Sequence, residues 1–235
     1  MGIRVILAIN TSSLRFSIAL MRGNGALVGE YSLVGGPKGS RPLFPALHEL
    51  LVHTNTDLKN VVAVGVAGGP GSFTGLRVGV ATAKGFCHGL GIPLIGVDTL
   101  EALAGQLSQT AYPVCAVIGS KKGEVFAALF RSDENGEVMR MTEDGCFKVV
   151  DLRDLVRERT IFIGDDFETQ APAIRSALGA DALLAPSPFW APKAAQVGAI
   201  TLNRLRSGSW DDLEEYVPNY MRSPEIGAAS VASRK

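Results

Sequence analysis

The chain has 235 residues, of which 46% are hydrophobic, and its 23 basic residues are balanced by 23 acidic ones. This length suits one large domain or two small lobes, each able to bury a core. A formal net charge of zero argues against strong nucleic-acid binding by this chain alone, because neutralising phosphates requires clustered Lys and Arg.

The cysteines and the N-terminal residues indicate the compartment. Cys87, Cys115 and Cys146 lie far apart and form neither a CxxC pair nor a disulfide framework, so a reducing environment is expected. The first residues lead directly into a predicted strand and lack the features of a signal peptide. No apolar run approaches the roughly 18 residues of a membrane span. We therefore expect a cytoplasmic protein without a membrane segment.

Hydrophobic periodicity predicts one order of elements in each half of the chain. The first half contains three strands, a helix, a strand and a second helix, at residues 4–10, 16–21, 26–33, 42–53, 61–66 and 74–89. The second half contains three strands, a helix, a strand and two helices, at residues 114–118, 124–130, 137–141, 151–159, 160–163, 169–178 and 191–206. Polar turns follow the first strand of each half, and a glycine-rich loop is expected at residues 35–40.

This order predicts an α/β protein with a duplicated βββαβα unit. Three consecutive strands followed by alternating helices and strands give a mixed sheet flanked by helices. Two such lobes side by side would leave a cleft between the turns that follow their first strands. The expected domains are an N-terminal lobe at 1–105, a C-terminal lobe at 106–226 and a flexible tail at 227–235.

The most informative segment is the glycine-rich run from Gly68 to Gly85. Its first four residues form a flexible turn, and Ser72 or Thr74 can cap the helix that follows. Glycine costs a helix about 1 kcal/mol relative to alanine, so several glycines indicate that another backbone approaches closely. Small residues form two ridges along the helix, Gly75-Gly79-Ala83 and Ala81-Gly85-Gly89. A phosphate-loop interpretation is disfavoured because the GxxxxGK[ST] spacing is absent.

Several motifs in this order resemble the TsaB (YeaZ) family. They are the segments at residues 6–12, 69–77, 81–85, 96–103, 123–126 and 217–222. The run Gly69-Pro70-Gly71-Ser72-Phe73-Thr74-Gly75-Leu76-Arg77 is the most specific of them. The resemblance spans nearly the whole chain and implies the two-lobed actin-like ATPase fold that sugar kinases and heat-shock chaperone ATPases share.

The resemblance also implies a function without catalysis by this chain. TsaB looks like a degenerate paralogue of TsaD that scaffolds or activates it, together with the ATPase TsaE, in placing threonylcarbamoyl on the adenosine beside the tRNA anticodon. ATP and metal are then expected on the partner subunits, and tRNA is contacted only through the complex. The helices at 42–53 and 74–89 would bind TsaD or a second TsaB, with interface residues Leu43, Leu47, Leu50, Gly75, Leu76, Gly79, Val80 and Ala83.

The positions that match the superfamily's nucleotide site lack carboxylates. Family resemblance places a magnesium-holding carboxylate at Asn10, where an amide is a poor ligand for a hard cation. The turn at 119–122 has no carboxylate either. Thr11, Ser12 and Ser13 could bind a phosphate or another anion, or could simply close a hairpin. His48 and His53 are five residues apart, which places them on different helix faces and disfavours a shared metal.

Two alternatives remain open at this stage. The chain could be an active nucleotide-dependent phosphotransferase or carbamoyltransferase of the same fold. It could also be a peptidase that acts on a partner through Ser72, although no sequence neighbour of Ser72 supplies a base. Arg77, Lys84 and His88 form a basic stripe that is either a solvated face or the border of a contact with a partner or with tRNA phosphates.

Overall fold

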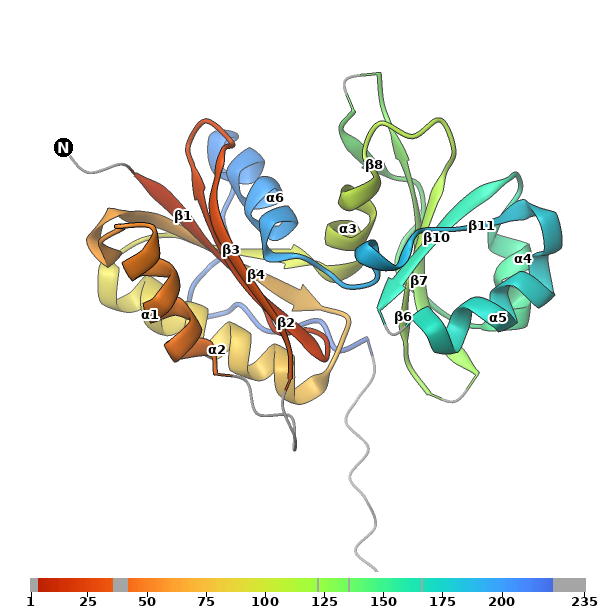
Figure 1. Ribbon diagram of the computed structural model, residues 1–235, viewed down its shortest axis with the longest axis horizontal. Helices are drawn as coiled ribbons and strands as arrows, with labels where there is room; N and C mark the ends of the chain where they lie inside the picture. The colour runs from red at the N-terminus through yellow and green to blue at the C-terminus, as the bar shows by residue number, and fades with distance from the viewer. Residues whose placement is uncertain (1–3, 36–41, 122, 135, 166, 222–235) are drawn as a thin grey trace, which may run out of the picture.

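Each half of the chain folds around its own mixed β-sheet in the computed structural model (Figure 1). The structure describes residues 4–35, 42–121, 123–134, 136–165 and 167–221. The expected tail at 227–235, and all of the expected loop at 35–40 except Gly35, lie outside these residues.

The first sheet has the strand order β3-β2-β1-β4-β5. Its strands are β1 (Val5–Asn10), β2 (Arg15–Arg22), β3 (Leu27–Val34), β4 (Val61–Gly69) and β5 (Leu94–Asp98). The central strand β1 is antiparallel to β2 and parallel to β4, and all six of its residues are buried. A strand covered on both faces reads as a continuous apolar run, which is why β1 shows no alternation of polar and apolar residues.

The second sheet repeats this arrangement in the order β8-β7-β6-β10-β11, with β9 added beside β7. Its strands are β6 (Val114–Gly119), β7 (Glu124–Ser132), β8 (Val138–Arg140), β9 (Gly145–Lys148), β10 (Thr160–Asp165) and β11 (Ala182–Leu184). The strand β6 is antiparallel to β7 and parallel to β10, as β1 is to β2 and β4. The predicted duplication is therefore confirmed in strand order and in strand direction.

Helices cover both faces of each sheet. They are α1 (Leu43–His53), α2 (Phe73–Leu90), α3 (Thr99–Ala104), α4 (Leu152–Leu155), α5 (Phe167–Leu178) and α6 (Ala194–Arg206). The helices α1 and α2 pack on one face of the first sheet, and α6 packs on the other (Figure 1). The helices α4 and α5 pack on one face of the second sheet, and α3 packs on the other.

The helices α3 and α6 are exchanged between the lobes and lie between the two sheets (Figure 1). The helix α3 follows β5 of the first sheet, yet Leu100 and Leu103 pack with Phe130 of the second. The helix α6 follows the second lobe, yet Val197 and Leu202 belong to the core of the first. The helix α6, which lies in the range expected for the C-terminal lobe, thus completes the core of the N-terminal lobe. The sequence did not predict this, because the apolar stripe of a helix does not specify which sheet the helix will cover.

Short elements were not predicted from the sequence. They are β5, β9, β11 and α3, none longer than six residues. The helix expected at 151–159 is also reduced to the single turn α4, preceded by a 3-10 turn. Segments this short contain too few periods to distinguish a strand or helix from a loop. None of the helices among the described residues has the length and hydrophobicity that crossing a bilayer would require.

The helix α2 approaches the end of β1 very closely. A Cβ atom added to Gly79 would lie 2.2 Å from Oγ1 of Thr11. That hydroxyl donates a hydrogen bond to the carbonyl oxygen of Gly75 at 2.7 Å, so it is held in place. Ser72 is the N-cap, and its hydroxyl oxygen accepts from the amide of Gly75 at 3.3 Å. The ridge that contains Gly75 and Gly79 therefore serves packing within the chain.

Alanine substitutions on the two sides of α2 should have opposite effects. Gly79→Ala should lower the free energy of unfolding by about 1–3 kcal/mol, because the new methyl group overpacks the site at Thr11. Gly85→Ala should raise it by about 0.5–1 kcal/mol, because no atom lies within 4 Å of the new methyl group and alanine favours the helix. Urea unfolding of both variants is the measurement, and a gain for Gly79→Ala would contradict this account of the packing.

Candidate functional site

The turn after β1, which contains the residues considered above for phosphate binding, is closed. Asn10 is fully buried. Its amide nitrogen donates to the carbonyl oxygen of Pro192 at 2.8 Å and to that of Arg15 at 3.4 Å. Its side-chain oxygen accepts from the hydroxyl of Ser12 at 2.6 Å and from the amide of Ser12 at 3.1 Å. Both ends of the Asn10 amide group are thus used inside the molecule.

The three hydroxyl residues considered for anion binding also point inward. Thr11, Ser12 and Ser13 are all buried. Thr11 bonds to α2 and Ser12 to Asn10, while the hydroxyl of Ser13 donates to the carbonyl oxygen of Arg15 at 2.9 Å. Of the two possibilities considered for these side chains, the structure therefore favours the closed turn, because their hydroxyls bond to α2, to Asn10 and to β2.

The interlobe cleft contains side chains of both charges. A hollow of about 440 Å³ is lined by residues of both lobes, among them Arg15 of the first lobe and Asp165 and Glu168 of the second. At the turn after β1, Asn10 supplies an amide where a magnesium ion prefers a carboxylate. The residues of this turn therefore do not fit a magnesium-bound nucleotide, and no chemical step is derived through this cofactor.

The eight residues predicted for the partner interface are buried in the chain's own core. Leu43, Leu47 and Leu50 of α1 and Val80 and Ala83 of α2 pack against the first sheet. Gly75, Leu76 and Gly79 are equally inaccessible. A partner cannot contact these side chains, and the residue list is corrected: the same helices present a different set of residues to the solvent.

We define the outer face of α1 and α2 by its exposed apolar and small residues. They are Phe44 and Val52 of α1 and Val78, Ala81, Gly85 and Gly89 of α2. Phe44 is 64% exposed, and its ring centre lies 6.2 Å from that of Phe86, so the aromatic pair bridges the two helices. A Cβ atom added to Gly85 or Gly89 would meet nothing within 4 Å, so a second backbone can approach α2 there.

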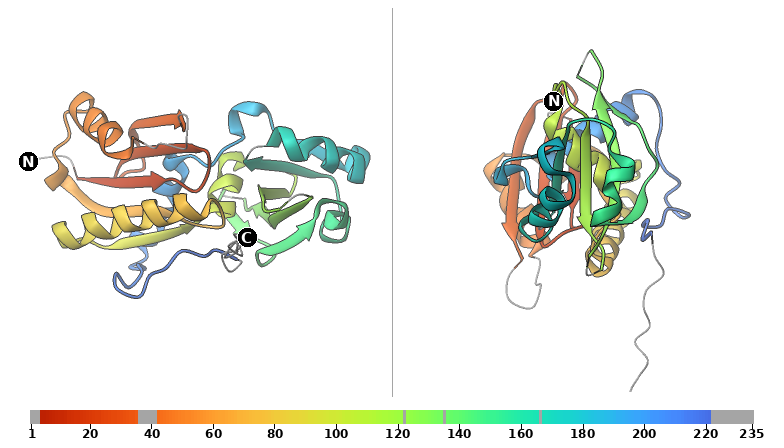
Figure 2. Two further views of the ribbon diagram at one scale, coloured as in Figure 1. Left: turned by 90° about the horizontal axis from the view of Figure 1, so that it is seen from below. Right: turned by 90° about the vertical axis from the view of Figure 1, so that its right-hand side faces the viewer.

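The basic stripe of α2 holds the C-terminal strap, which we define as residues 208–221. Lys84 donates to the carbonyl oxygens of Glu214 and Tyr216 at 3.0 and 3.3 Å. Arg77 donates to the hydroxyl of Tyr220 at 3.2 Å, and its guanidinium lies 3.9 Å from the ring centre of Phe73. Figure 2 shows the strap running along the first lobe. Two members of the stripe are therefore used for an internal contact.

The remaining candidate groups do not converge. His48 is exposed on α1, and His53 lies 3.8 Å from Glu49 on the same helix. Among the described residues, no group of three or more His, Cys, Asp and Glu side chains is placed to hold a metal ion. Burial raises the pKa of Cys87 to about 11 and also raises that of Cys115, so both thiols stay protonated and unreactive.

Comparison with known proteins decides the family. The family model described as TsaD, tRNA N6-adenosine threonylcarbamoyltransferase, matches residues 38–165, which is more than half of the chain. The Bacillus subtilis tRNA threonylcarbamoyladenosine biosynthesis protein TsaB is 27% identical over 233 residues, which cover 98% of this chain and 99% of the relative. The Escherichia coli TsaB is 35% identical over 133 residues, covering 56% and 57% of the two chains. This chain belongs to the TsaB (YeaZ) family. It is thereby linked to the biosynthesis of threonylcarbamoyladenosine in tRNA.

Solved structures confirm the fold. YeaZ from Pseudomonas aeruginosa is similar with a TM-score of 0.76 and 24% identity, covering 92% of this chain and 100% of that one. The activator of 2-hydroxyisocaproyl-CoA dehydratase from Clostridium difficile reaches a TM-score of 0.50 at 8% identity, covering 88% and 99%. The two-lobed actin-like ATPase fold predicted for this TsaB-family chain is thus confirmed.

Restoring a carboxylate at the end of β1 should destabilise the protein. Asn10→Asp replaces the amide donor to Pro192 by a buried charge, at a cost of about 3–5 kcal/mol of unfolding free energy near neutral pH. Burial raises the pKa of such a carboxyl in the folded state, so the loss should grow as pH rises from 4 to 8. Chemical denaturation across this range measures it.

The matched control is Asn24→Asp. Asn24 is exposed, and its side-chain oxygen accepts from the amide of Ala26, a bond that a carboxylate preserves. Its unfolding free energy should change by less than about 0.5 kcal/mol. Equal effects of the two substitutions would show that Asn10 is not specifically required as a donor.

Proposed function

We propose that this chain is a non-catalytic subunit that binds a TsaD-like protein through the outer face of α1 and α2. It acts in the cytoplasm, in the threonylcarbamoylation of the adenosine beside the tRNA anticodon. A TsaE-like ATPase joins the same complex, and tRNA is contacted through the complex. The observation that carries the proposal is the surface of apolar and small residues on the outer face of α1 and α2. The turn after β1, by contrast, is closed.

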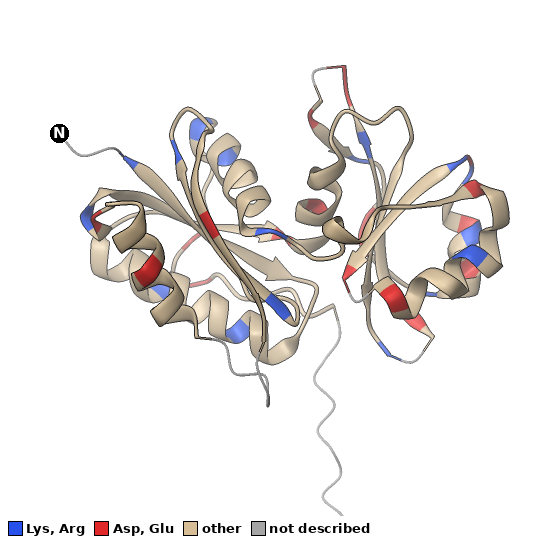
Figure 3. Ribbon diagram, in the orientation of Figure 1, with Lys and Arg blue, Asp and Glu red and all other residues tan. Residues whose placement is uncertain are grey.

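The composition of the outer face supports a protein partner. Exposed apolar residues that gather on one surface mark interaction sites, and small residues let a second helix come near. Figure 3 shows the acidic and basic residues of the described part of the chain dispersed over both lobes. Such a charge distribution favours a protein partner over direct nucleic-acid binding by this chain. A second copy of this chain could use the same face, so homodimer and heterodimer compete.

A charge on the outer face should weaken the complex. Val78 is 40% exposed on α2, and Val78→Asp should reduce affinity for the TsaD-like partner at least about thirty-fold, the effect of losing about 2 kcal/mol at an interface hot spot. Co-purification and titration calorimetry with the partner measure the change. Size-exclusion chromatography of the chain with and without the partner reports whether the homodimer is lost as well.

The control is Val150→Asp, which places the same charge at a residue that is 54% exposed on the second lobe. Its affinity for the partner should equal that of the unmodified chain. Undiminished binding by Val78→Asp, or an equal loss in the two variants, would exclude the outer face as the contact.

The isolated chain should not turn over ATP. Calorimetric titration with ATP and magnesium should give no heat of specific binding, because the turn at Asn10 offers neither a carboxylate nor an outward hydroxyl. Micromolar binding accompanied by hydrolysis or group transfer would instead support the alternative of an active phosphotransferase or carbamoyltransferase. Cleavage of a partner that is lost in Ser72→Ala would support the peptidase alternative.

A further inference from the structure

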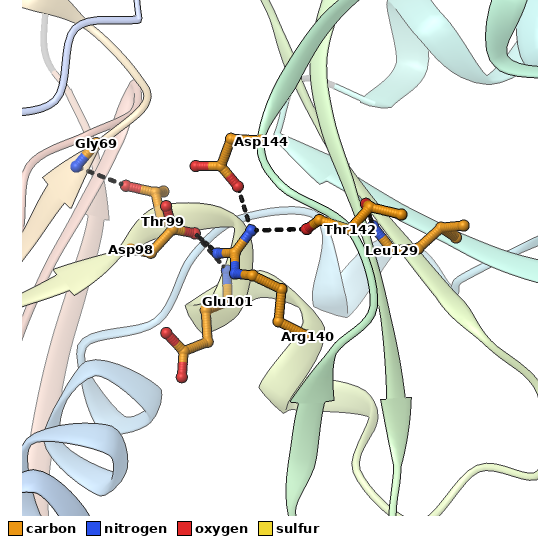
Figure 4. A network of polar contacts seen from close by, with 8 residues as sticks. All are labelled: Gly69, Asp98, Thr99, Glu101, Leu129, Arg140, Thr142 and Asp144. Atoms are coloured by element: carbon orange, nitrogen blue, oxygen red, sulfur yellow. Dashed lines mark hydrogen bonds and ion pairs between the residues drawn. The ribbon is translucent and has the colours of Figure 1, made fainter. Parts of the chain in front are cut away.

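A network of polar side chains lies where the chain passes from the first lobe to the second (Figure 4). Asp98 is the last residue of β5 and the N-cap of α3, where its carboxylate accepts from the amide of Glu101 at 2.8 Å. The same carboxylate oxygen lies 3.0 Å from the guanidinium of Arg140, the last residue of β8. This ion pair joins the edge of the first sheet to the edge strand β8 of the second.

The guanidinium of Arg140 is held on several sides. One nitrogen pairs with the carboxylate of Asp144 and lies 3.4 Å from the carbonyl oxygen of Thr142. The guanidinium carbon lies 4.8 Å from the ring centre of Phe130. The side chains of Asp98 and Asp144 are only 19% and 14% exposed, and that of Arg140 is 29% exposed. Charge pairs this far removed from water are screened less than surface pairs.

The network continues toward α2. Thr99, the first residue of α3, accepts with its hydroxyl oxygen from the amide of Gly69 at 3.2 Å (Figure 4). Gly69 ends β4 and lies three residues before Ser72, the N-cap of α2. The carbonyl oxygen of the neighbouring Gly68 accepts from the amide of Asn219 in the strap at 2.8 Å. The N-terminus of α3 thus contacts Arg140 on one side and the segment leading into α2 on the other.

We propose that Arg140 is an interlobe latch: by bridging Asp98 and Asp144, it fixes the second lobe against the N-terminus of α3 and fixes the segment leading into α2 with it. The inference goes beyond the proposed function and is tested on the isolated chain. Without the guanidinium, two nearly buried carboxyl groups face each other, and the lobes separate to solvate them.

A proton bound by Asp98 or Asp144 can partly replace the guanidinium of Arg140 between the two carboxyl groups. Burial, with the adjacent Asp144 adding to it, raises the pKa of Asp98 to about 7, although Arg140 and the Glu101 amide oppose the rise. The other charged or titratable groups near Asp98 are Glu101 on α3, Arg204 on α6, and Asp211 and Tyr216 on the strap. Burial also raises the pKa of Glu101.

The sign of the pH dependence follows from linkage. The closed state binds a proton at Asp98 more readily than a state in which Asp98 is solvated. Low pH therefore favours the closed arrangement of the lobes, and this stabilisation is lost as pH rises from about 4 through 7. Opening caused by loss of Arg140 should be larger at pH 8 than at pH 6, because at pH 6 a proton shared by the two carboxyls still reduces their repulsion.

The test compares Arg140→Gln with Arg131→Gln. Arg131 pairs with Glu158 within the second lobe, and both side chains are exposed, so its loss removes an ion pair without crossing the lobes. In Arg140→Gln at pH 8, amide exchange at Gly69 and Glu101 should be about tenfold faster than in the unmodified chain, and the small-angle scattering radius should increase. Both effects should shrink at pH 6, and Arg131→Gln should show neither.

A second variant keeps the test decisive if Arg140→Gln fails to fold. Asp98→Asn retains an oxygen that can cap α3 and removes the titrating charge. At pH 8 its amide exchange and scattering radius should lie between those of the unmodified chain and those of Arg140→Gln, because the ion pair with Arg140 is lost but no pair of repelling carboxylates is left. Equal exchange and radius in Arg140→Gln and Arg131→Gln, or equal exchange and radius in Asp98→Asn and the unmodified chain at pH 8, would overturn the latch.

Discussion

The close approach of α2 to the end of β1 is the contact on which the first lobe depends. With glycine at position 79, the helix backbone comes within reach of Thr11, whose hydroxyl bonds back to Gly75. A helix with a larger side chain at position 79 would stand farther from the sheet and would leave the turn after β1 open. One steric condition therefore closes the turn and at the same time sets which residues of α2 face the solvent.

The close packing of α2 at Gly79 affects both the turn after β1 and the side of α2 that is exposed to solvent. The side of α2 that packs on β1 uses the hydroxyl group of Thr11 through Gly75, while the hydroxyls of Ser12 and Ser13 bond to Asn10 and Arg15. The opposite side, with Gly85 and Gly89, has open space above it. The strap follows the remaining side through Arg77 and Lys84. With two sides of α2 occupied by the sheet and the strap, the exposed apolar stripe is the side on which the proposal of a partner subunit rests.

The sequence predicted the long elements and their duplicated order, because each of these elements has enough residues to show the apolar spacing that is typical of a helix or a strand. It did not predict β5 or β11, which have five and three residues, or the exchange of α3 and α6. Both small-residue ridges of α2 have the same spacing, so the spacing alone did not show which ridge faces the sheet. Leu76 and Val80, which lie beside the ridge of Gly75 and Gly79 and are both buried, indicate the inward side.

The exchanged helices explain why a single side chain can govern the relation between the lobes. Each sheet is covered by a helix that the other half of the chain supplies, so the lobes share cores and cannot separate completely while folded. A change in the angle between the lobes, by contrast, requires contacts at the crossing to break, and these include the ion pairs of Arg140. A charge-assisted bond of about 1.5–3 kcal/mol is small beside a shared core, yet it is large enough to shift such an angle. Since the same crossing contacts Gly69, which lies three residues before the N-cap of α2, such a change in angle would act on the start of α2, the helix that carries most of the outer face.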